Sequence, residues 1–331
     1  MTLLRSLVAT ARMIRHTARL AEGLPADEEM LLDAPDRRLA PALVAAGRGE
    51  HGGAAELLAA TRERAAWEDR DRYAVRLAAF ALRRHDWLTA WRALAPGDPD
   101  VALLAAELAV HRALSSPARV ELLRAAGPLV AAAAEANPGD PVPWRVALDH
   151  ARSARAPRRR FDAVWAEAGR RASHHYGCHV AALRYLAAAG HGAAACLDFA
   201  ERAAGDALPG SLIQALPARA ALAGLLPGAP AAGSRVPAAR LHRAADRAIA
   251  LSAARPPADP RLAEVRNLLT YLLVALERWP EALTQIRLLG TGVTSFPWDA
   301  VSDDPLGQFL ELRDGVRIQI ATRTPLRARA D

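Results

Sequence analysis

The chain of 331 residues is 52% hydrophobic and 24% charged, a balance that excludes a wholly disordered polypeptide. Alanine is abundant and aromatic residues make up only 5%, which disfavours an all-β fold because alanine forms helices well and strands poorly. The formal net charge is +7 with no lysine, and the densest basic runs, residues 155–160 and 323–329, are short, which disfavours a dedicated nucleic-acid binder.

Helical periodicity runs through almost the whole chain, and Pro and Gly interrupt it at short intervals. An amphipathic helix is expected first, within residues 2–22. Further helices are expected near residues 36–48, 52–64, 67–84, 86–95, 99–114, 117–136, 141–153, 158–172, 176–189, 192–204, 209–225, 237–254, 259–277, 279–289 and 304–321. No segment has a convincing period of two; residues 316–320 come closest, but a lone strand would have no partner.

Three Asp-Pro pairs mark expected helix starts. Asp98, Asp140 and Asp259 each precede a proline, and this combination is typical of an N-cap followed by the first helical residue. Proline suits that position because the backbone N–H that it lacks would have no partner within the helix. The pairs therefore predict helices that begin close to these three residues.

A repeating pattern of small and apolar residues links neighbouring helices. An apolar residue is followed four positions later by a small or apolar one, then nine later by an alanine, and four later by an apolar residue. The pattern occurs at Leu77, Ala81, Ala90 and Leu94, at Ala182, Leu186, Ala195 and Phe199, and at Leu269, Leu273, Ala282 and Ile286. Two antiparallel helices approach closely where a small residue faces the partner, so the pattern favours helix pairs.

These spacings resemble those of tetratricopeptide repeats. The resemblance implies an all-α fold, an α-solenoid of antiparallel helix pairs with degenerate tetratricopeptide-like repeats. A narrower resemblance rests on residues 140–148, 189–212 and 289–313, which are similar to segments of an uncharacterised family of helical proteins from high-GC Gram-positive bacteria. That family has no assigned activity, so the likeness implies a helical fold and a cytoplasmic location but no catalysis.

Composition suggests five segments along the chain. Residues 1–35 would form an N-terminal amphipathic helix and linker, and residues 36–225 a helical-repeat array. The Pro- and Gly-rich residues 226–237 cannot continue a helix and are expected to form a loop. Residues 238–322 would continue the array with C-terminal repeats, and residues 323–331 would form a basic tail.

Cysteine usage and hydropathy indicate a cellular compartment. Cys178 and Cys196 lie in alanine-rich helical surroundings, which suits buried free thiols and a reducing environment. No apolar run reaches the length that spans a bilayer, and residues 2–22 lack the continuous apolar core of a secretory signal. We therefore expect a cytoplasmic protein without a membrane span.

Most sequence patterns of catalysis and nucleotide binding are missing. Gly47–Gly52 reads G-x-G-x-x-G, but an alanine-rich helical segment precedes it instead of a strand, so a turn between helices is favoured. The sequence has no H-E-x-x-H and no G-x-S-x-G, and without lysine it can form neither a P-loop nor a Schiff base. The chain is therefore expected to lack a cofactor, and an enzyme is disfavoured without being excluded.

Histidine and cysteine gather in one short segment. Spacings of three and four would place His175, Cys178 and His179 on one helix face, where they could ligate zinc. A zinc site needs four ligands, and the rest would have to come from His191 or Asp198. We therefore favour packing or contact with a partner over a metal site.

The favoured function is a scaffold that binds a protein or peptide in a concave groove, as other solenoids do. The candidate partner-binding residues are His175, His179, Trp87 and Trp91; the two tryptophans share a helix face that would form either core or groove lining. One alternative is an enzyme or natural-product tailoring protein whose helices enclose a small-molecule pocket. A second alternative is a nucleic-acid binder that uses the arginine excess.

Overall fold

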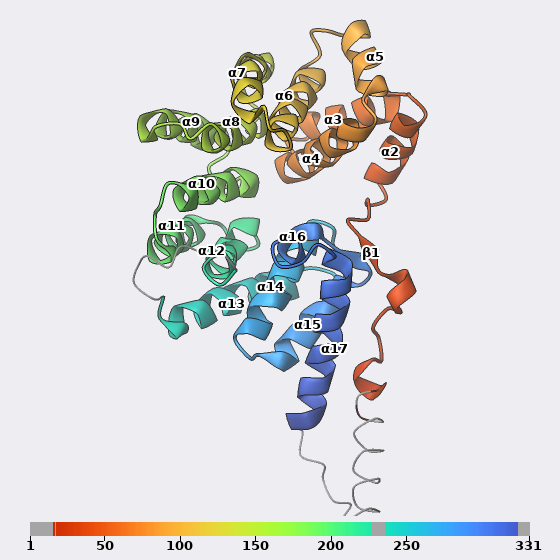
Figure 1. Cartoon of the computed structure of the whole chain (residues 1–331), viewed down its shortest axis with the longest axis vertical. Helices are drawn as coiled ribbons and strands as arrows, with labels where there is room; N and C mark the ends of the chain where they lie inside the picture. The colour runs from red at the N-terminus through yellow and green to blue at the C-terminus, as the bar shows by residue number, and fades with distance from the viewer. Residues whose placement is uncertain (1–15, 17, 227–235, 324–331) are drawn as a thin grey trace, which may run out of the picture. The chain divides into compact units, whose positions relative to one another are not determined.

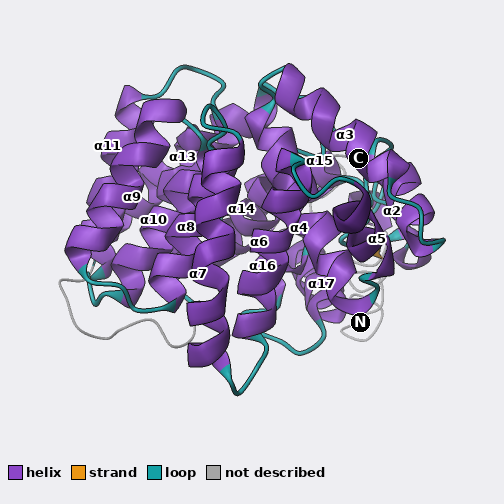
Figure 2. Ribbon diagram, turned by 90° about the horizontal axis from the view of Figure 1, so that it is seen from above, coloured by secondary structure: helices purple, strands orange, loops and turns teal. Residues whose placement is uncertain are grey.

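The computed structural model describes residues 16, 18–226 and 236–323, and these residues are almost entirely helical (Figure 1). Helices dominate the view in Figure 2, where short loops join them. The all-helical fold class is therefore confirmed for the described part of the chain. The amphipathic helix expected within residues 2–22 lies mostly outside the described residues, as do the loop at 226–237 and the basic tail.

Contacts divide the chain into two compact units. One consists of residues 35–216, and the other joins residues 1–34 with residues 217–331. The helices that follow residue 217 thus group with the N-terminal segment, and the division precedes the loop that the composition suggested as a break. Part of the expected N-terminal linker is ordered, because residues 27–32 form a 3-10 helix and a short strand.

The helices of the unit 35–216 follow the sequence prediction closely. They are α2 (Leu39–Gly47), α3 (Gly52–Glu63), α4 (Trp67–Arg83), α5 (Asp86–Leu94), α6 (Pro99–Leu114), α7 (Arg119–Ala136), α8 (Val142–Ser153), α9 (Arg158–Arg171), α10 (Tyr176–Ala188), α11 (Ala193–Asp206) and the 3-10 helix η2 (Leu212–Ala215). The short helix α12 (Leu216–Ala223) begins at the end of this unit.

Two sets of helices alternate along this unit. The inner helices α2, α4, α6, α8 and α10 contact one another in that order, and α10 also reaches α4. The outer helices lie against them: α7 contacts α6 and α8, and α9 contacts α8 and α10. Burial agrees with this order, because α6 and α8 bury residues on several sides, whereas α9 buries only Phe161, Val164 and Ala168.

Capping explains where several of these helices begin. The Asp98 carboxylate accepts a hydrogen bond from the Asp100 N–H at 2.8 Å, with Pro99 as the first residue of α6, as the sequence predicts. Asp140 accepts from the Val142 N–H at 2.8 Å in the same way. Asp259 instead caps the turn at residue 261, so the helix expected from residue 259 begins later, at Ala263.

The second unit contains the remaining elements. They are η1 (Asp27–Glu29), β1 (Leu31–Leu32), α13 (Ala238–Ala253), α14 (Ala263–Ala275), α15 (Trp279–Leu289), β2 (Gly292–Val293), α16 (Ser295–Trp298) and α17 (Pro305–Arg323). The two short strands pair in parallel, with Leu31 opposite Gly292, and this pairing joins the N-terminal segment to the C-terminal helices. Residues 316–320, the segment most similar to a strand in sequence, lie within α17.

A buried arginine holds this unit together. Arg266 of α14 donates to the carbonyl oxygens of Ser252 and Pro256 at 3.1 and 2.9 Å, and to that of Leu288 at 2.9 Å. The carbonyls of Ser252 and Leu288 belong to the last turns of α13 and α15, where the helix dipole favours a positive charge, and Pro256 follows the end of α13. Beside it, the Trp298 indole donates to the Asn267 side chain at 2.8 Å. One fully buried cation therefore ties the C-terminal ends of two helices to α14.

The burial of the repeat positions differs between the two units. Leu269, Leu273, Ala282 and Ile286 are all buried where α14 contacts α15, as the pattern predicts. On α5, however, Ala90 and Leu94 are exposed, while Trp87, Leu88 and Trp91 are buried. Helix α5 is rotated relative to the orientation that the repeat pattern predicts, because the large indoles of Trp87 and Trp91 occupy the interior.

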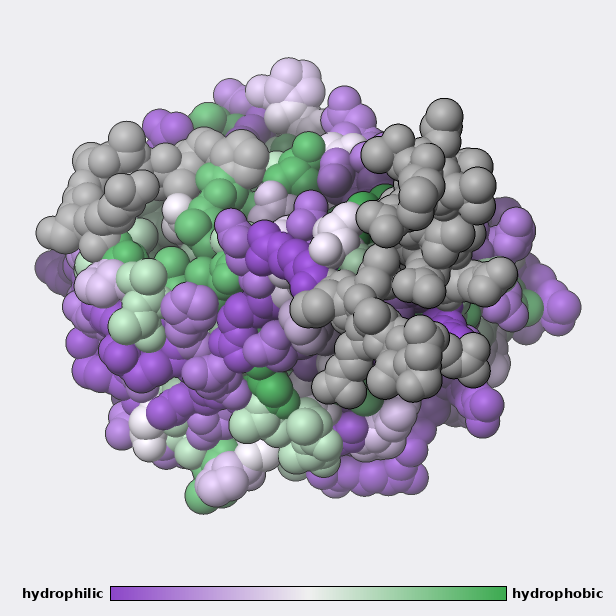
Figure 3. Space-filling model, turned by 90° about the horizontal axis from the view of Figure 1, so that it is seen from below, coloured by the Kyte–Doolittle hydropathy of each residue, from purple (hydrophilic) through white to green (hydrophobic). Residues whose placement is uncertain are grey.

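Apolar side chains also remain at the surface, and Figure 3 shows such groups among hydrophilic side chains on one face.

Candidate functional site

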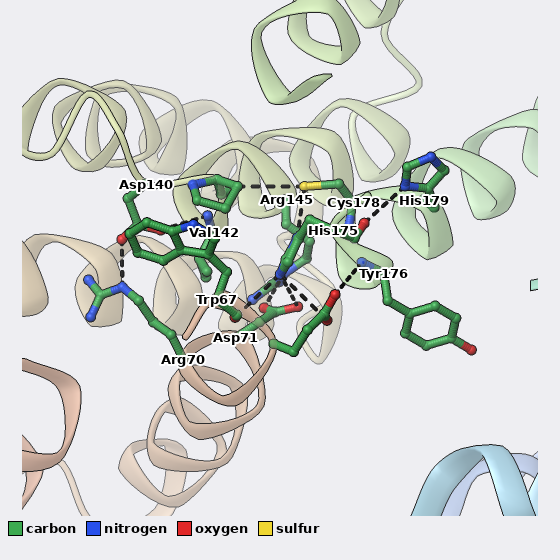
Figure 4. Close-up of polar contacts among 12 residues, drawn as sticks. Trp67, Arg70, Asp71, Asp140, Val142, Arg145, His175, Tyr176, Cys178 and His179 are labelled. Carbon is green, nitrogen blue, oxygen red and sulfur yellow. Dashed lines mark hydrogen bonds and ion pairs between the residues drawn. The ribbon is translucent and has the colours of Figure 1, made fainter. Parts of the chain in front are cut away.

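A buried network of charged side chains links α4, α6, α8 and the start of α10, and Figure 4 shows the part of it around Arg70, Arg145 and His175. Its first centre is Arg70 of α4, which is completely buried. The Arg70 guanidinium pairs with Asp140 at 2.5 Å and with Asp100 at 2.6 Å, and it donates to the Leu58 carbonyl oxygen at 3.0 Å. Asp100 and Asp140 both lie at the starts of helices, where a carboxylate also interacts favourably with the helix dipole.

Arg145 of α8 is the second centre of the network. Its guanidinium contacts three carboxylates, Asp71 at 2.8 Å, Glu107 at 2.7 Å and Asp149 at 3.4 Å. Burial alone would raise the pKa of Glu107, but the charge of Arg145, with hydrogen bonds from His111 and Arg145, lowers it to about 2. The same carboxylates raise the pKa of Arg145 well above its usual value despite its burial. Three inner helices are thus joined by one cation.

His175 lies at the N-cap of α10, where its backbone is extended and not helical. The ring Nδ1 accepts a hydrogen bond from the Cys178 N–H at 3.3 Å, so this nitrogen carries the lone pair and Nε2 the proton. Nε2 lies 3.4 Å from the Trp67 carbonyl oxygen and 3.8 and 3.9 Å from the carboxylates of Glu68 and Asp71. His175 therefore precedes the helix instead of lying on its face as predicted, and the cap turns its ring toward α4, although the ring still contacts Cys178.

Cys178, His175 and the two carboxylates resemble the arrangement of a cysteine nucleophile. The Cys178 Sγ atom is 3.1 Å from His175 Nδ1, and the opposite ring nitrogen faces the acids. However, the thiol is only 1% exposed, and burial together with the charge of Asp71 raises its pKa well above the usual value. A nucleophilic cysteine needs a thiolate that a substrate can reach, so this thiol is packed as a small apolar group.

Gly177 allows the carboxylates of α4 to approach the start of α10. A Cβ atom at this position would lie 1.9 Å from Asp71 Oδ2. Next to it, the Glu68 carboxylate accepts a hydrogen bond from the Tyr176 N–H at 2.8 Å. The missing side chain of Gly177 therefore makes room for the network.

His179 packs at the interface of α10 with its neighbours. Its Nδ1 donates to the His175 carbonyl oxygen at 2.9 Å, and its ring meets Trp165 edge-on with 4.9 Å between centroids. Phe199 lies beside it, with 6.1 Å between ring centroids. Burial lowers the pKa of His179, so the imidazole is neutral at pH 7. Both histidines are buried, and neither ring offers an open surface to a partner.

Trp87 and Trp91 belong to the core of the unit 35–216. They are 0% and 2% exposed, with 6.4 Å between their ring centroids, and His51 stacks on Trp91. The sequence leaves open whether these tryptophans form the core or line a groove, and their burial matches core packing. The four candidate partner-binding residues therefore do not share a surface.

The network centred on Arg70 and Arg145 is absent from the sequence prediction, although a signal for part of it exists. Glu107 and Arg145 are each the one charged residue in an otherwise apolar stretch of an inner helix, Val101–Val110 and Val142–Leu148. A single charge within such a stretch is rarely buried unless it is paired. The identity of the partners cannot be read from the chain, because they lie 38 and 74 residues from Arg145.

The described residues contain no group of three or more His, Cys, Asp or Glu side chains that could hold a metal ion. A pocket of about 160 Å³ has none of residues 174–179 in its lining, which consists of Arg38, Leu57, Ala60, Thr61, Arg64, Ala66 and Tyr73. None of the described helices has both the length and the apolar composition that crossing a bilayer requires.

Comparison of the chain with protein families, with curated proteins and with solved structures found no match.

Proposed function

We propose that the protein is a helical-repeat scaffold that binds a protein or peptide. The order of helix contacts in the unit 35–216 supports this proposal, because inner helices follow one another and outer helices lie against successive inner ones. That order is typical of an α-solenoid of antiparallel helix pairs with degenerate tetratricopeptide-like repeats. We also propose that the chain is related to the uncharacterised helical proteins of high-GC Gram-positive bacteria that it resembles, and that it is cytoplasmic.

The buried network would give such a scaffold a rigid binding surface. Arg145 joins α4, α6 and α8, so the side chains at the edge of the network cannot shift independently. Several of them reach solvent: the side chains of Arg72, His111 and Arg152 are 25%, 25% and 24% exposed. Prearranged charged groups lower the entropy cost of binding, which favours recognition of a polar segment.

The single observation that carries the proposal is the state of Glu68. Its side chain is 33% exposed, and its carboxylate lies 3.8 Å from the Nε2 atom of His175, with no arginine beside it among the described ion pairs. Burial raises the pKa of this carboxyl, against the opposing effects of His175 and the Tyr176 N–H. A basic side chain of a ligand would supply the missing cation. The expected ligand is therefore a protein segment that carries arginine or lysine.

Selection from a displayed library of random peptides tests this proposal. Enriched peptides are expected to contain arginine or lysine, and their affinity is measured by fluorescence anisotropy. Glu68→Gln should weaken binding about tenfold, the loss expected for one charge-assisted contact. The matched control is Glu56→Gln, which neutralises an exposed carboxylate on α3 outside the network and should leave the affinity unchanged. Failure to enrich any peptide, or equal binding by wild type and Glu68→Gln, would contradict the proposal.

A further inference from the structure

The exposed face of α7 carries an apolar stripe that no other described element covers. Leu122, Ala125, Leu129, Ala132 and Ala136 follow one another at spacings of three and four residues, and all five are exposed. Leu122 and Leu129 are 36% and 39% exposed, which is unusual for two leucines one heptad apart. The opposite face of α7 is buried against α6 and α8, so the stripe is not needed for the packing of the unit itself.

The outer helix α9 shows that this stripe does not follow from the position of α7 in the fold. Both helices lie against two inner helices, yet the exposed residues of α9 include Arg159, Arg160, Asp162 and Arg170. Charged residues keep such a surface in water. The stripe of α7 (residues 122, 125, 129, 132 and 136) repeats at the spacing of a coiled-coil seam, which is typical of a helix that packs against another helix.

We propose that the stripe of α7 is the interface of a homodimer in which two copies of α7 pack antiparallel around Leu129. In this register Leu122 of one copy packs against Ala136 of the other, and the alanines allow close approach of the two helices. Arg124 of one copy then lies beside Glu135 of the other, twice in the symmetric dimer. Both side chains are exposed on the same flank of the stripe. In a parallel pair the twofold axis would run along the helices, so the flanks that carry Arg124 and Glu135 would lie on opposite sides of the dimer and these contacts would not form.

The size of the stripe sets the strength expected of this dimer. An 18-residue helix is about 27 Å long, and a single helix pair buries less than the ~1,600 Å² of a standard stable interface. The dimer should therefore be reversible, with a dissociation constant on the order of 10 µM. The proposal goes beyond the binding of a peptide by the inner helices, because it needs none of the residues of that surface.

Sedimentation velocity of the full chain across a range of micromolar concentrations tests the proposal. The wild type is expected to change from monomer to dimer, and Leu129→Glu, which places two carboxylates at the twofold axis, should raise the dissociation constant at least tenfold. Leu82→Glu on α4, at a leucine of similar exposure (37%), is the matched control and should dimerise as the wild type does. Both substitutions are at exposed positions, and circular dichroism verifies that each variant is folded.

Charge reversal distinguishes the orientation of the two helices. Arg124→Glu should weaken the dimer by several-fold, because it would place two carboxylates together, and the double change Arg124→Glu with Glu135→Arg should restore it. In a parallel pair neither Arg124 nor Glu135 of one copy would reach these residues of the other, so the single change would leave the affinity unaltered. A monomer at every concentration, a Leu129→Glu variant that dimerises normally, or no recovery in the double variant would overturn the proposal.

Discussion

Replacing Arg145 with methionine should destabilise the unit 35–216 strongly at neutral pH. The side chain is 7% exposed and faces Asp71, Glu107 and Asp149, so its removal leaves three carboxylates without their shared cation. The fall in the Glu107 pKa from 4.5 to about 2 corresponds to about 3 kcal/mol of stability. Breaking a buried ion pair on one side typically costs about 3–5 kcal/mol, so we expect a loss in this range at pH 7.

The same substitution should change how stability depends on pH. In the wild type the folded pKa of Glu107 is below its unfolded value, so its stabilising effect is present above pH 4.5 and is lost as pH falls toward about 2. Without Arg145, burial remains as the main influence and raises the pKa of Glu107 above 4.5. Protonation then relieves the buried charge. The difference in stability between wild type and Arg145→Met should therefore shrink between pH 7 and pH 5.

Urea unfolding at both pH values measures these effects, followed by circular dichroism and by tryptophan fluorescence. Arg92→Met is the control, since Arg92 is exposed on α5 of the same unit, and it should change the free energy of unfolding by less than about 0.5 kcal/mol. The double variant Arg145→Met with Glu107→Met should recover part of the loss, because no ionised Glu107 remains in the core. A loss below about 1 kcal/mol at pH 7, or a difference that stays constant down to pH 5, would refute the reasoning.

Two further substitutions test packing by measured melting curves. Gly177→Ala should lower the free energy of unfolding by about 1–3 kcal/mol, because the new Cβ atom would collide with Asp71. The control Gly169→Ala on α9 has open space around it and should raise the free energy of unfolding by about 0.5–1 kcal/mol. A Gly177→Ala variant that is more stable than the wild type would show that Asp71 can move aside freely. Ala282→Leu should cost about 1–3 kcal/mol because residue 282 is fully buried between α14 and α15, and an unaltered melting temperature would show that this contact is misplaced.

The local part of the fold can be read from the sequence. Helices α6 and α15 begin and end at the residues that the sequence predicts, because each starts with a proline in its first turn and each stops where the apolar pattern stops. The helix that the sequence predicts from residue 259 begins later, because the Asp259-Pro pair caps a turn, which such a pair does as readily as it caps a helix. The pairing of Leu31 with Gly292 leaves no local signal, since a two-residue strand has no periodicity and its partner is far along the chain.

The candidate site was only partly accessible to sequence reasoning. The sequence predicts a cluster of the histidines and the cysteine at residues 175–179, but spacing alone places them on one helix face. A shared face requires a helical His175, whereas this residue caps the helix with an extended backbone. The carboxylates that surround it come from α4, about a hundred residues earlier, so their position depends on how the inner helices stack. Long-range ion pairs of this kind follow from tertiary packing and not from local pattern.

Hydrogen–deuterium exchange of the full chain, with and without an enriched basic peptide at saturating concentration, tests the central claim most directly. Binding along the inner helices predicts that exchange slows in α4 around Glu68 and in α8 around Arg152, where the exposed edge of the network lies. The outer helix α9 should exchange at the same rate in both states. Slower exchange confined to helices outside α4, α6 and α8 would contradict the claim that this surface binds the ligand.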